Sequence, residues 1–166
     1  MRAQLNTATA SVLDLSKLTF IIILLFALIG IAVSVELTVV HHSTHTDNKF
    51  SSMCAVNDRV NCETVARSPY SVFLGAPVSV WGILGYFLIG LFSVWGLQCS
   101  KYNRSWPLGV LTVLAFFALC TSGFLAYISF TKIDSICLFC MTLYVIAILL
   151  TVWMSVTFIK FKLNPV

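Results

Sequence analysis

Charged residues are scarce in this sequence and are missing from four long stretches. Only 10% of the 166 residues are charged, whereas a soluble domain carries about 25%. Hydrophobic residues make up 59% of the chain, so much of its surface has to face lipid. The net charge of +4 comes without a basic patch for nucleic acid. The uncharged stretches are Leu18 to Val35, Ser68 to Ser100, Ser105 to Thr131 and Ser135 to Ile159.

Each stretch is long enough to hold a membrane-spanning helix. The hydrocarbon core requires about 20 helical residues, and the backbone polar groups within it have to be paired. The sequence therefore predicts an all-α membrane protein, a single domain over residues 1–166 that forms a four-transmembrane-helix bundle in membrane lipid. The predicted spans are residues 17–40, 77–97, 106–130 and 136–158. An outer loop over residues 41–76 joins the first two.

The outer loop is the one long polar segment between the spans. Asn61 to Ala66 has fair helix propensity, and Asn61 or Asp58 is suited to cap a short helix there. Further along, Gly75 to Pro77 predicts a turn, with Pro77 in the first turn of the next helix.

The distribution of basic residues predicts which side of the membrane each segment faces. With four spans both chain ends share a side, and cytoplasmic segments carry an excess of Lys and Arg. Six basic residues on the side of the ends against four on the other predict cytoplasmic N and C termini. The six are Arg2, Lys17, Lys101, Arg104, Lys160 and Lys162, and the four are Lys49, Arg59, Arg67 and Lys132.

A C-x-x-C motif stands at the start of the fourth predicted helix. Its cysteines are Cys137 and Cys140, with Asp134 and Ser135 as candidate caps just before them. Sulfurs at this spacing lie one turn apart on nearly the same helix face. The positive end of the helix dipole favours a thiolate there and lowers the thiol pKa.

A second pair, Cys54 and Cys62, flanks seven residues of the outer loop. One pair on a loop and one at a helix start form the arrangement that an electron relay requires, because exchange proceeds through a mixed disulfide. The alternative is two stabilising disulfides, which are common outside the cytoplasm. A C-x-x-C bridge closes too small a loop to stabilise much, which favours a redox role for that pair.

Together these motifs resemble the vitamin K epoxide reductase family, over roughly Leu18 to Phe158. Animal epoxide reductases carry an asparagine at the start of the second span, where the nearest residues here are Val78 and Ser79. The quinone-reducing bacterial type is therefore the better match. The matching segments are the loop pair with Ser68-Pro-Tyr, Phe73-Leu-Gly-Ala-Pro77 with Trp81-Gly, and Cys137-Leu-Phe-Cys140-Met-Thr-Leu-Tyr144.

The resemblance implies a membrane thiol–disulfide oxidoreductase that supports disulfide formation in secreted proteins. Electrons from a thioredoxin-like extracytoplasmic protein would enter at Cys62 and pass from Cys54 to Cys137. Cys140 would reduce a quinone, ubiquinone or menaquinone, whose oxygen Tyr144 would bind. The implied location is the bacterial inner membrane with a periplasmic active site. Because the sequence ends at Val166, we expect the partner to be a separate protein.

Three further residues are predicted to serve the substrate. Ser68 corresponds to the family serine that holds the loop over the site. Phe73 and Trp81 are suited to wall a flat apolar ring, since ligand pockets are mostly apolar. For Trp81 the alternative is an anchor at the membrane surface.

The alternative function is a membrane metal-binding or metal-transport protein. His41, His42 and His45, expected just outside the first span, and the cysteines are ligand types that suit copper or zinc. The second and third predicted spans, however, offer no ionisable group that would mark an ion pathway, apart from cysteine and tyrosine. We therefore expect no metal in the site.

Overall fold

Within the described residues, four helices are long and apolar enough to span a membrane. The computed structural model describes residues 2–47, 51–52, 54, 57, 59–98 and 105–163, with side chains from residue 17 to residue 160 apart from residue 105. The chain is thus an all-α integral membrane protein, as its composition predicts. The long helices are α1 (Arg2–Thr46), α3 (Val78–Gln98), α4 (Ser105–Ile128) and α5 (Leu138–Leu163).

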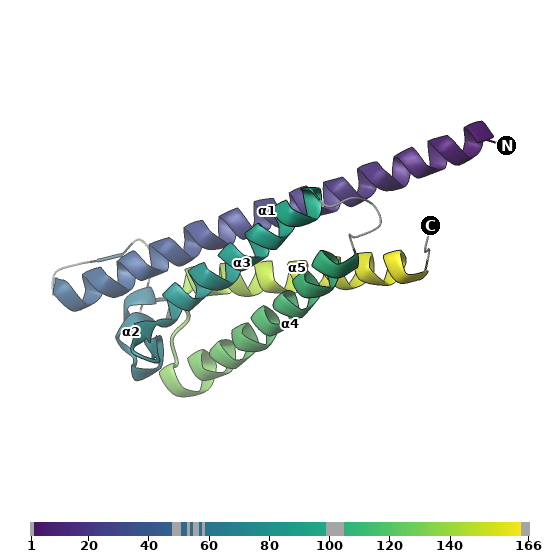
Figure 1. The fold of residues 1–166 in the computed structure, drawn as a ribbon. Coiled ribbons are helices and arrows are strands. Elements are labelled where there is room, and N and C mark those ends of the chain that lie inside the picture. Colours follow the sequence, from purple (N-terminus) through teal and green to yellow (C-terminus); the bar gives the residue numbers. More distant parts are fainter. Residues whose placement is uncertain are drawn as a thin grey trace.

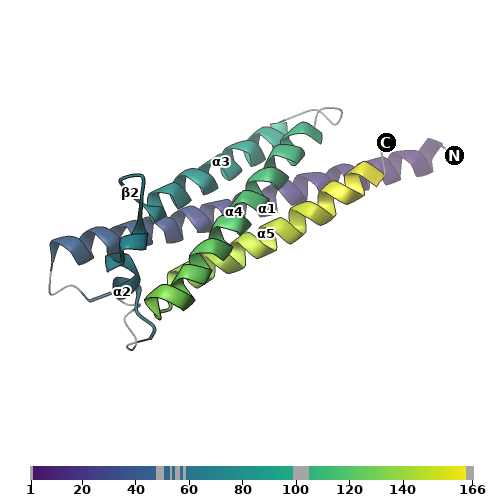
Figure 2. The same cartoon turned by 90° about the horizontal axis from the view of Figure 1, so that it is seen from below.

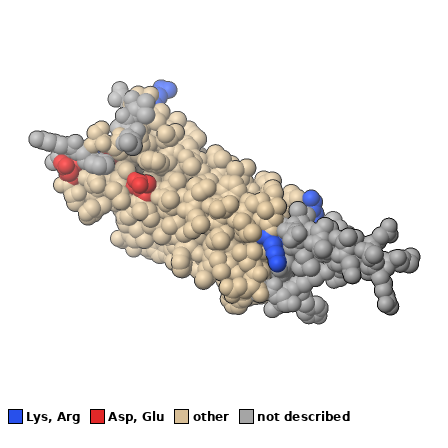
Figure 3. Space-filling view, turned by 90° about the horizontal axis from the view of Figure 1, so that it is seen from above, with Lys and Arg blue, Asp and Glu red and all other residues tan. Residues whose placement is uncertain are grey.

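The long helices form a bundle whose two ends differ in character. The N-terminal end of α1 and the C-terminal end of α5 lie at one end, and the short helix α2 (Cys62–Arg67) lies at the other (Figure 1). In Figure 2, α4 passes across α1, and α5 begins beside the far end of α4. On the face drawn in Figure 3, the coloured charged side chains lie toward the two ends, with an uncharged band between them. That band is the surface that lipid would cover.

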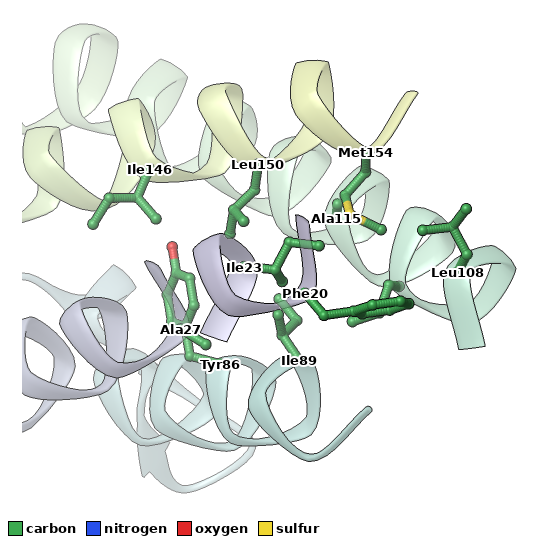
Figure 4. Close-up of a cluster of buried hydrophobic side chains, with 11 residues drawn as sticks. Phe20, Ile23, Ala27, Tyr86, Ile89, Leu108, Ala115, Ile146, Leu150 and Met154 are labelled. Atoms are coloured by element: carbon green, nitrogen blue, oxygen red, sulfur yellow. The ribbon is translucent and has the colours of Figure 1, made fainter. Parts of the chain in front are cut away.

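The bundle closes as a ring, because α1 packs on α3, α3 on α4, α4 on α5 and α5 on α1. Its centre is an apolar cluster to which every long helix contributes (Figure 4). The hydroxyl of Tyr86 donates a hydrogen bond to the Leu143 carbonyl at 3.3 Å and so joins α3 to α5. The buried members of the cluster are Phe20, Ile23, Ala27, Tyr86, Ile89, Leu108, Leu111, Ala115, Ile146, Leu150 and Met154.

Glycines let α1 and α3 approach closely. Gly30 of α1 lies under the ring of Tyr86, and Gly96 of α3 lies under the ring of Phe20. Without a hydrophobic force between helices in lipid, association depends on such close packing of small residues. These two contacts hold α1 and α3 together along the bundle.

The first helix is longer than predicted. The sequence suggested that it ends at Val40, but α1 continues to Thr46. His41, His42 and His45 therefore lie on the helix and not beyond it, and the rings of His41 and His45 contact each other at a tilt, with centroids 4.5 Å apart. The extra turn and a half is held by helix-internal bonds from Thr44 and Thr46 side chains to backbone carbonyls.

Beyond α2 the loop forms elements that the sequence did not predict. A 3₁₀ turn, η1 (Pro69–Ser71), leads into a hairpin of β1 (Val72–Phe73) and β2 (Ala76–Pro77). The strands are antiparallel and pair Val72 with Pro77 and Phe73 with Ala76. The turn falls at Leu74 and Gly75, which both have positive φ, at 52° and 80°. The predicted turn was therefore one residue too late, and Pro77 belongs to the hairpin.

The segment between α4 and α5 also differs from its prediction. A π-helical turn, η3 (Ser129–Ile133), extends α4 where a tight turn was expected. Asp134 follows in the left-handed conformation with φ of 51°. The Ser135 carbonyl accepts a 2.6 Å hydrogen bond from the Ser129 hydroxyl. Neither Asp134 nor Ser135 caps α5, because that helix begins only at Leu138.

The predicted orientation is open to a direct test by labelling in intact cells. In a background without native cysteines, His45→Cys is expected to react with a membrane-impermeant maleimide from outside. Asn103→Cys, outside the described residues, is expected to react only after the membrane is permeabilised. The reason is the excess of basic residues on the side of the chain ends. The opposite labelling pattern would contradict the prediction and would place both chain ends outside.

Candidate active site

Cys137 occupies the N-cap position of α5. Its sulfur accepts a hydrogen bond from the Cys140 backbone N–H at 3.2 Å, and its carbonyl accepts the first helical bond from Met141. An N-cap side chain normally supplies an oxygen for this purpose. A hydrogen bond from the Cys140 thiol, helped by the backbone N–H groups of Cys140 and Phe139, lowers the pKa of Cys137 despite its burial. The site thus favours a thiolate at Cys137.

A short parallel bridge fastens the outer loop to the start of α5. Val60 pairs with Ile136, with hydrogen bonds from the Asn61 N–H to the Ile136 carbonyl (3.1 Å) and from the Ile136 N–H to the Arg59 carbonyl (2.7 Å). Cys137 follows Ile136 directly, and Cys62 comes two residues after Val60. The bridge therefore brings the loop pair and the C-x-x-C together, although they are far apart in the sequence.

Helix α2 holds Cys62 at its first position. Asn61 caps this helix by accepting hydrogen bonds from the N–H groups of Glu63 and Thr64 at 2.9 and 3.3 Å. The Glu63 carboxylate in turn accepts a 2.6 Å hydrogen bond from the Ser52 backbone N–H. This bond ties the segment before Cys54 to α2, so both loop cysteines are held by one local network.

Three sulfur atoms meet at the end of the bundle that carries α2. Cys54 and Cys62 form a disulfide with their Cα atoms 5.6 Å apart, whereas Cys137 and Cys140 are free thiols. The sulfurs of Cys54, Cys62 and Cys137 all lie within 4.8 Å of one another. Each of these three residues is at most 2% exposed, and Val40 of α1 packs against them. A buried disulfide thus lies beside the Cys137 thiol, whose pKa is lowered by hydrogen bonds from the Cys140 thiol and from backbone N–H groups at the start of α5.

Cys140 and Tyr144 lie deeper along α5. Cys140 packs against the sulfur cluster, and both residues are half-buried. Tyr144 follows Cys140 by one helical turn, so the two side chains lie on the same helix face. The Tyr144 hydroxyl forms no hydrogen bond with the part of the chain that the structure describes. A thiol and an unpaired phenol therefore adjoin one another inside the membrane-spanning segment.

The other predicted substrate residues, Ser68, Phe73 and Trp81, are not among the residues that form the cluster around the sulfurs. Ser68 donates a 2.8 Å hydrogen bond to the Val65 carbonyl and so closes the end of α2. Phe73 and Trp81 are 60% and 42% exposed, and the Trp81 ring N–H donates to the Phe73 carbonyl at 3.0 Å. These two rings contact each other on the hairpin side. Their role at a quinone remains a prediction.

Sequence reasoning missed the residues that join the two pairs. Val60 and Ile136 act through their backbones, so no side-chain type signals the bridge. Glu63 left a weak signal, because an acidic residue in the first turn of a capped helix is a common feature. Its bond to Ser52 spans eleven residues and was not predictable from spacing.

A buried disulfide that faces an activated thiol at the mouth of a four-helix membrane bundle defines a membrane thiol–disulfide oxidoreductase. Comparison with known families agrees. The sequence model of the Vitamin K epoxide reductase family matches residues 21–155, most of the chain, and the chain belongs to that family. A comparison with curated proteins finds no match.

Proposed function

We propose that this protein transfers electrons from a separate thioredoxin-like protein, through its two cysteine pairs, to a quinone dissolved in the membrane. The observation that carries the proposal is the loop disulfide of Cys54 and Cys62 with the Cys137 sulfur within 4.8 Å of both sulfurs. The quinone would be ubiquinone or menaquinone, and the setting a bacterial cytoplasmic membrane with this site facing outward. The activity would support disulfide formation in secreted proteins.

The internal step is a thiol–disulfide exchange between the pairs. When the partner has reduced the loop, the Cys54 thiolate attacks Cys137 of a Cys137–Cys140 disulfide, and Cys140 leaves as a thiolate. Cys62 then attacks Cys54, which re-forms the loop disulfide and releases Cys137. Two electrons and two protons have passed to the C-x-x-C. The product has a closed loop disulfide and free Cys137 and Cys140, the same bonding as in the structure.

The final step reduces the quinone as the Cys137–Cys140 disulfide closes. Two electrons and two protons leave the thiol pair and convert the quinone to a quinol. The donor set suits such a substrate, because Cys140 is the deeper thiol and the Tyr144 phenol is unpaired and half-buried. A hydrogen bond from Tyr144 would stabilise the charge that develops on a quinone oxygen. The apolar bundle excludes water from this reaction.

Electron entry requires the loop to move. Cys54 and Cys62 are each only 1% exposed, so a partner thiol cannot reach either sulfur in this conformation. The contacts that have to open are the hydrogen bonds of the bridge between Val60 and Ile136. Two backbone hydrogen bonds contribute roughly 1–3 kcal/mol in total, which is small enough to break during each turnover.

The entry point can be tested by trapping. The reagent is a thioredoxin-like protein with a single active-site cysteine, which is activated as a mixed disulfide with an aromatic thiol. Cys54→Ala is expected to form a stable disulfide between Cys62 and this cysteine. Neither the loop nor the partner then has a second thiol that resolves the bond. The Cys137 thiol, whose sulfur lies within 4.8 Å of that of Cys62, could still resolve it, so the reaction is repeated in Cys54→Ala/Cys137→Ala. Mass spectrometry of the linked peptides identifies the cysteine involved. The matched control is Cys62→Ala, in which we expect much less adduct. An adduct mapped only to Cys137 or Cys140 would show that electrons bypass the loop.

A further inference from the structure

We propose that the fully reduced protein binds one thiophilic divalent cation of the zinc class at Cys54, Cys62 and Cys137. Such an ion would hold the relay closed until the cation is removed. The sequence led us to expect no metal, and it is the geometry of the three sulfurs that points to a cation in the reduced protein. Its regulatory consequence rests on the electron route proposed above.

The sulfur positions are close to those of a metal site. A tetrahedral zinc ion binds thiolates at about 2.3 Å, which puts neighbouring sulfurs roughly 3.8 Å apart. The sulfurs of Cys54, Cys62 and Cys137 already lie within 4.8 Å of one another. Reduction of the disulfide frees the two loop sulfurs to separate, and their Cα atoms lie 5.6 Å apart in the disulfide-bonded protein. Small side-chain rotations therefore suffice to form the site.

The backbone around the sulfurs is held by bonds that do not depend on the disulfide. Cys62 is fixed by α2 and its Asn61 cap, and Cys137 by the hydrogen bonds of Ile136. The Cys137 sulfur also accepts the Cys140 N–H. Hydrogen bonds of this kind orient metal ligands from the outer shell. The three ligands come from three segments, which the bridge between Val60 and Ile136 and the hydrogen bond from Ser52 to Glu63 hold together.

Burial makes a cation favourable once the sulfurs are reduced. The three residues are 1%, 1% and 2% exposed, so three thiolates there would be poorly solvated. A divalent cation offsets two of the three negative charges of the thiolates. Neutral thiols do not bind the ion, so binding requires that the thiols lose their protons. Binding releases up to three protons and moves no electrons. The fourth coordination position can take a water molecule.

The site depends on the redox state. While Cys54 and Cys62 are joined, two of the three donors are part of a disulfide and cannot act as thiolate ligands. Both pairs are reduced together only when the partner supplies electrons and no quinone removes them. The cation would then occupy the cysteines that the relay needs, and would block it at low acceptor supply.

The test uses purified full-length protein, reduced by a phosphine and desalted without oxygen. Titration with Zn²⁺ is expected to show one tight site in reduced protein and none at this position in protein with the loop disulfide closed. Co²⁺ in place of Zn²⁺ should give a sulfur-to-metal charge-transfer band. Cys62→Ala should weaken binding by more than the roughly 10–100-fold loss typical of an outer-shell change. Cys140→Ala should stay within that range.

Cys120→Ala is the matched control, because Cys120 is a free and exposed thiol on α4. It should keep both the affinity and the Co²⁺ band. Equal binding by oxidised and reduced protein, or full affinity in Cys62→Ala, would overturn the proposal. Absence of zinc binding in a protein that still reduces quinone would refute only the metal site. Zinc binding without quinone reduction would refute only the proposed function.

Discussion

Cys140→Ala is expected to abolish quinone reduction. Without Cys140 the C-x-x-C disulfide cannot close beside the quinone, so the two electrons have no path to the substrate. Cys140 is also the deeper of the two thiols and lies one turn from Tyr144 on α5. The measurement is quinol formation by purified protein in detergent with a dithiol donor. The Cys120→Ala variant should retain the full rate, since its thiol lies exposed on α4.

Tyr144→Phe separates the two halves of the same reaction. It should slow quinol formation by at most the ~10²–10³-fold seen on loss of one oxyanion-hole donor. Disulfide exchange between the loop pair and the C-x-x-C should proceed at a nearly unchanged rate. It is measured without quinone, by alkylation of the free thiols. Full quinone reduction by Cys140→Ala would contradict the assignment and would favour two structural disulfides. Loss of exchange in Tyr144→Phe would mean that the phenol supports the fold.

Gly30→Ala is expected to destabilise the bundle and to reduce activity with it. A Cβ atom at Gly30 would lie 2.5–2.7 Å from ring atoms of Tyr86, which cannot withdraw without leaving the core or its bond to the Leu143 carbonyl. Overpacking of this kind costs about 1–3 kcal/mol. The measurement is thermal unfolding in detergent, followed by circular dichroism, together with quinol formation.

Gly85→Ala provides the matched control on the facing helix. Nothing lies within 4 Å of a Cβ atom placed at Gly85. Alanine is a better helix former than glycine by about 1 kcal/mol, so this variant should be as stable as the parent protein or slightly more so. Equal destabilisation of both variants would contradict the inference that Gly30 allows the close approach of α1 and α3.

The sequence was most informative where one residue type carries the signal. Four uncharged stretches are sufficient to predict four spanning helices, because lipid leaves the backbone few alternatives. Asn61 identifies the start of α2, since few residue types cap a helix. It was least informative at boundaries such as Thr46, where the end of α1 depends on packing at the outer loop.

The hairpin and the turn before α5 show the same limit. Leu74 adopts a positive φ that its residue type disfavours, so the turn could not be placed from glycine alone. Asp134 and Ser135 have the residue types of helix caps. The residues before them form η3, however, and α5 begins only at Leu138, so Cys137 occupies the cap position. In each case a neighbouring element overrides a local preference.

The sequence by itself determined that the chain spans a membrane, that it carries a loop pair and a C-x-x-C, and that the second pair starts a helix. These features depend on local composition and spacing. Only the tertiary structure decided that Cys54 and Cys62 form a disulfide and that the Cys137 sulfur lies within 4.8 Å of it. That proximity comes from two backbone hydrogen bonds between Arg59 to Asn61 and Ile136. Backbone groups are the same in every residue except proline, so side-chain identities leave no trace of which strands will meet.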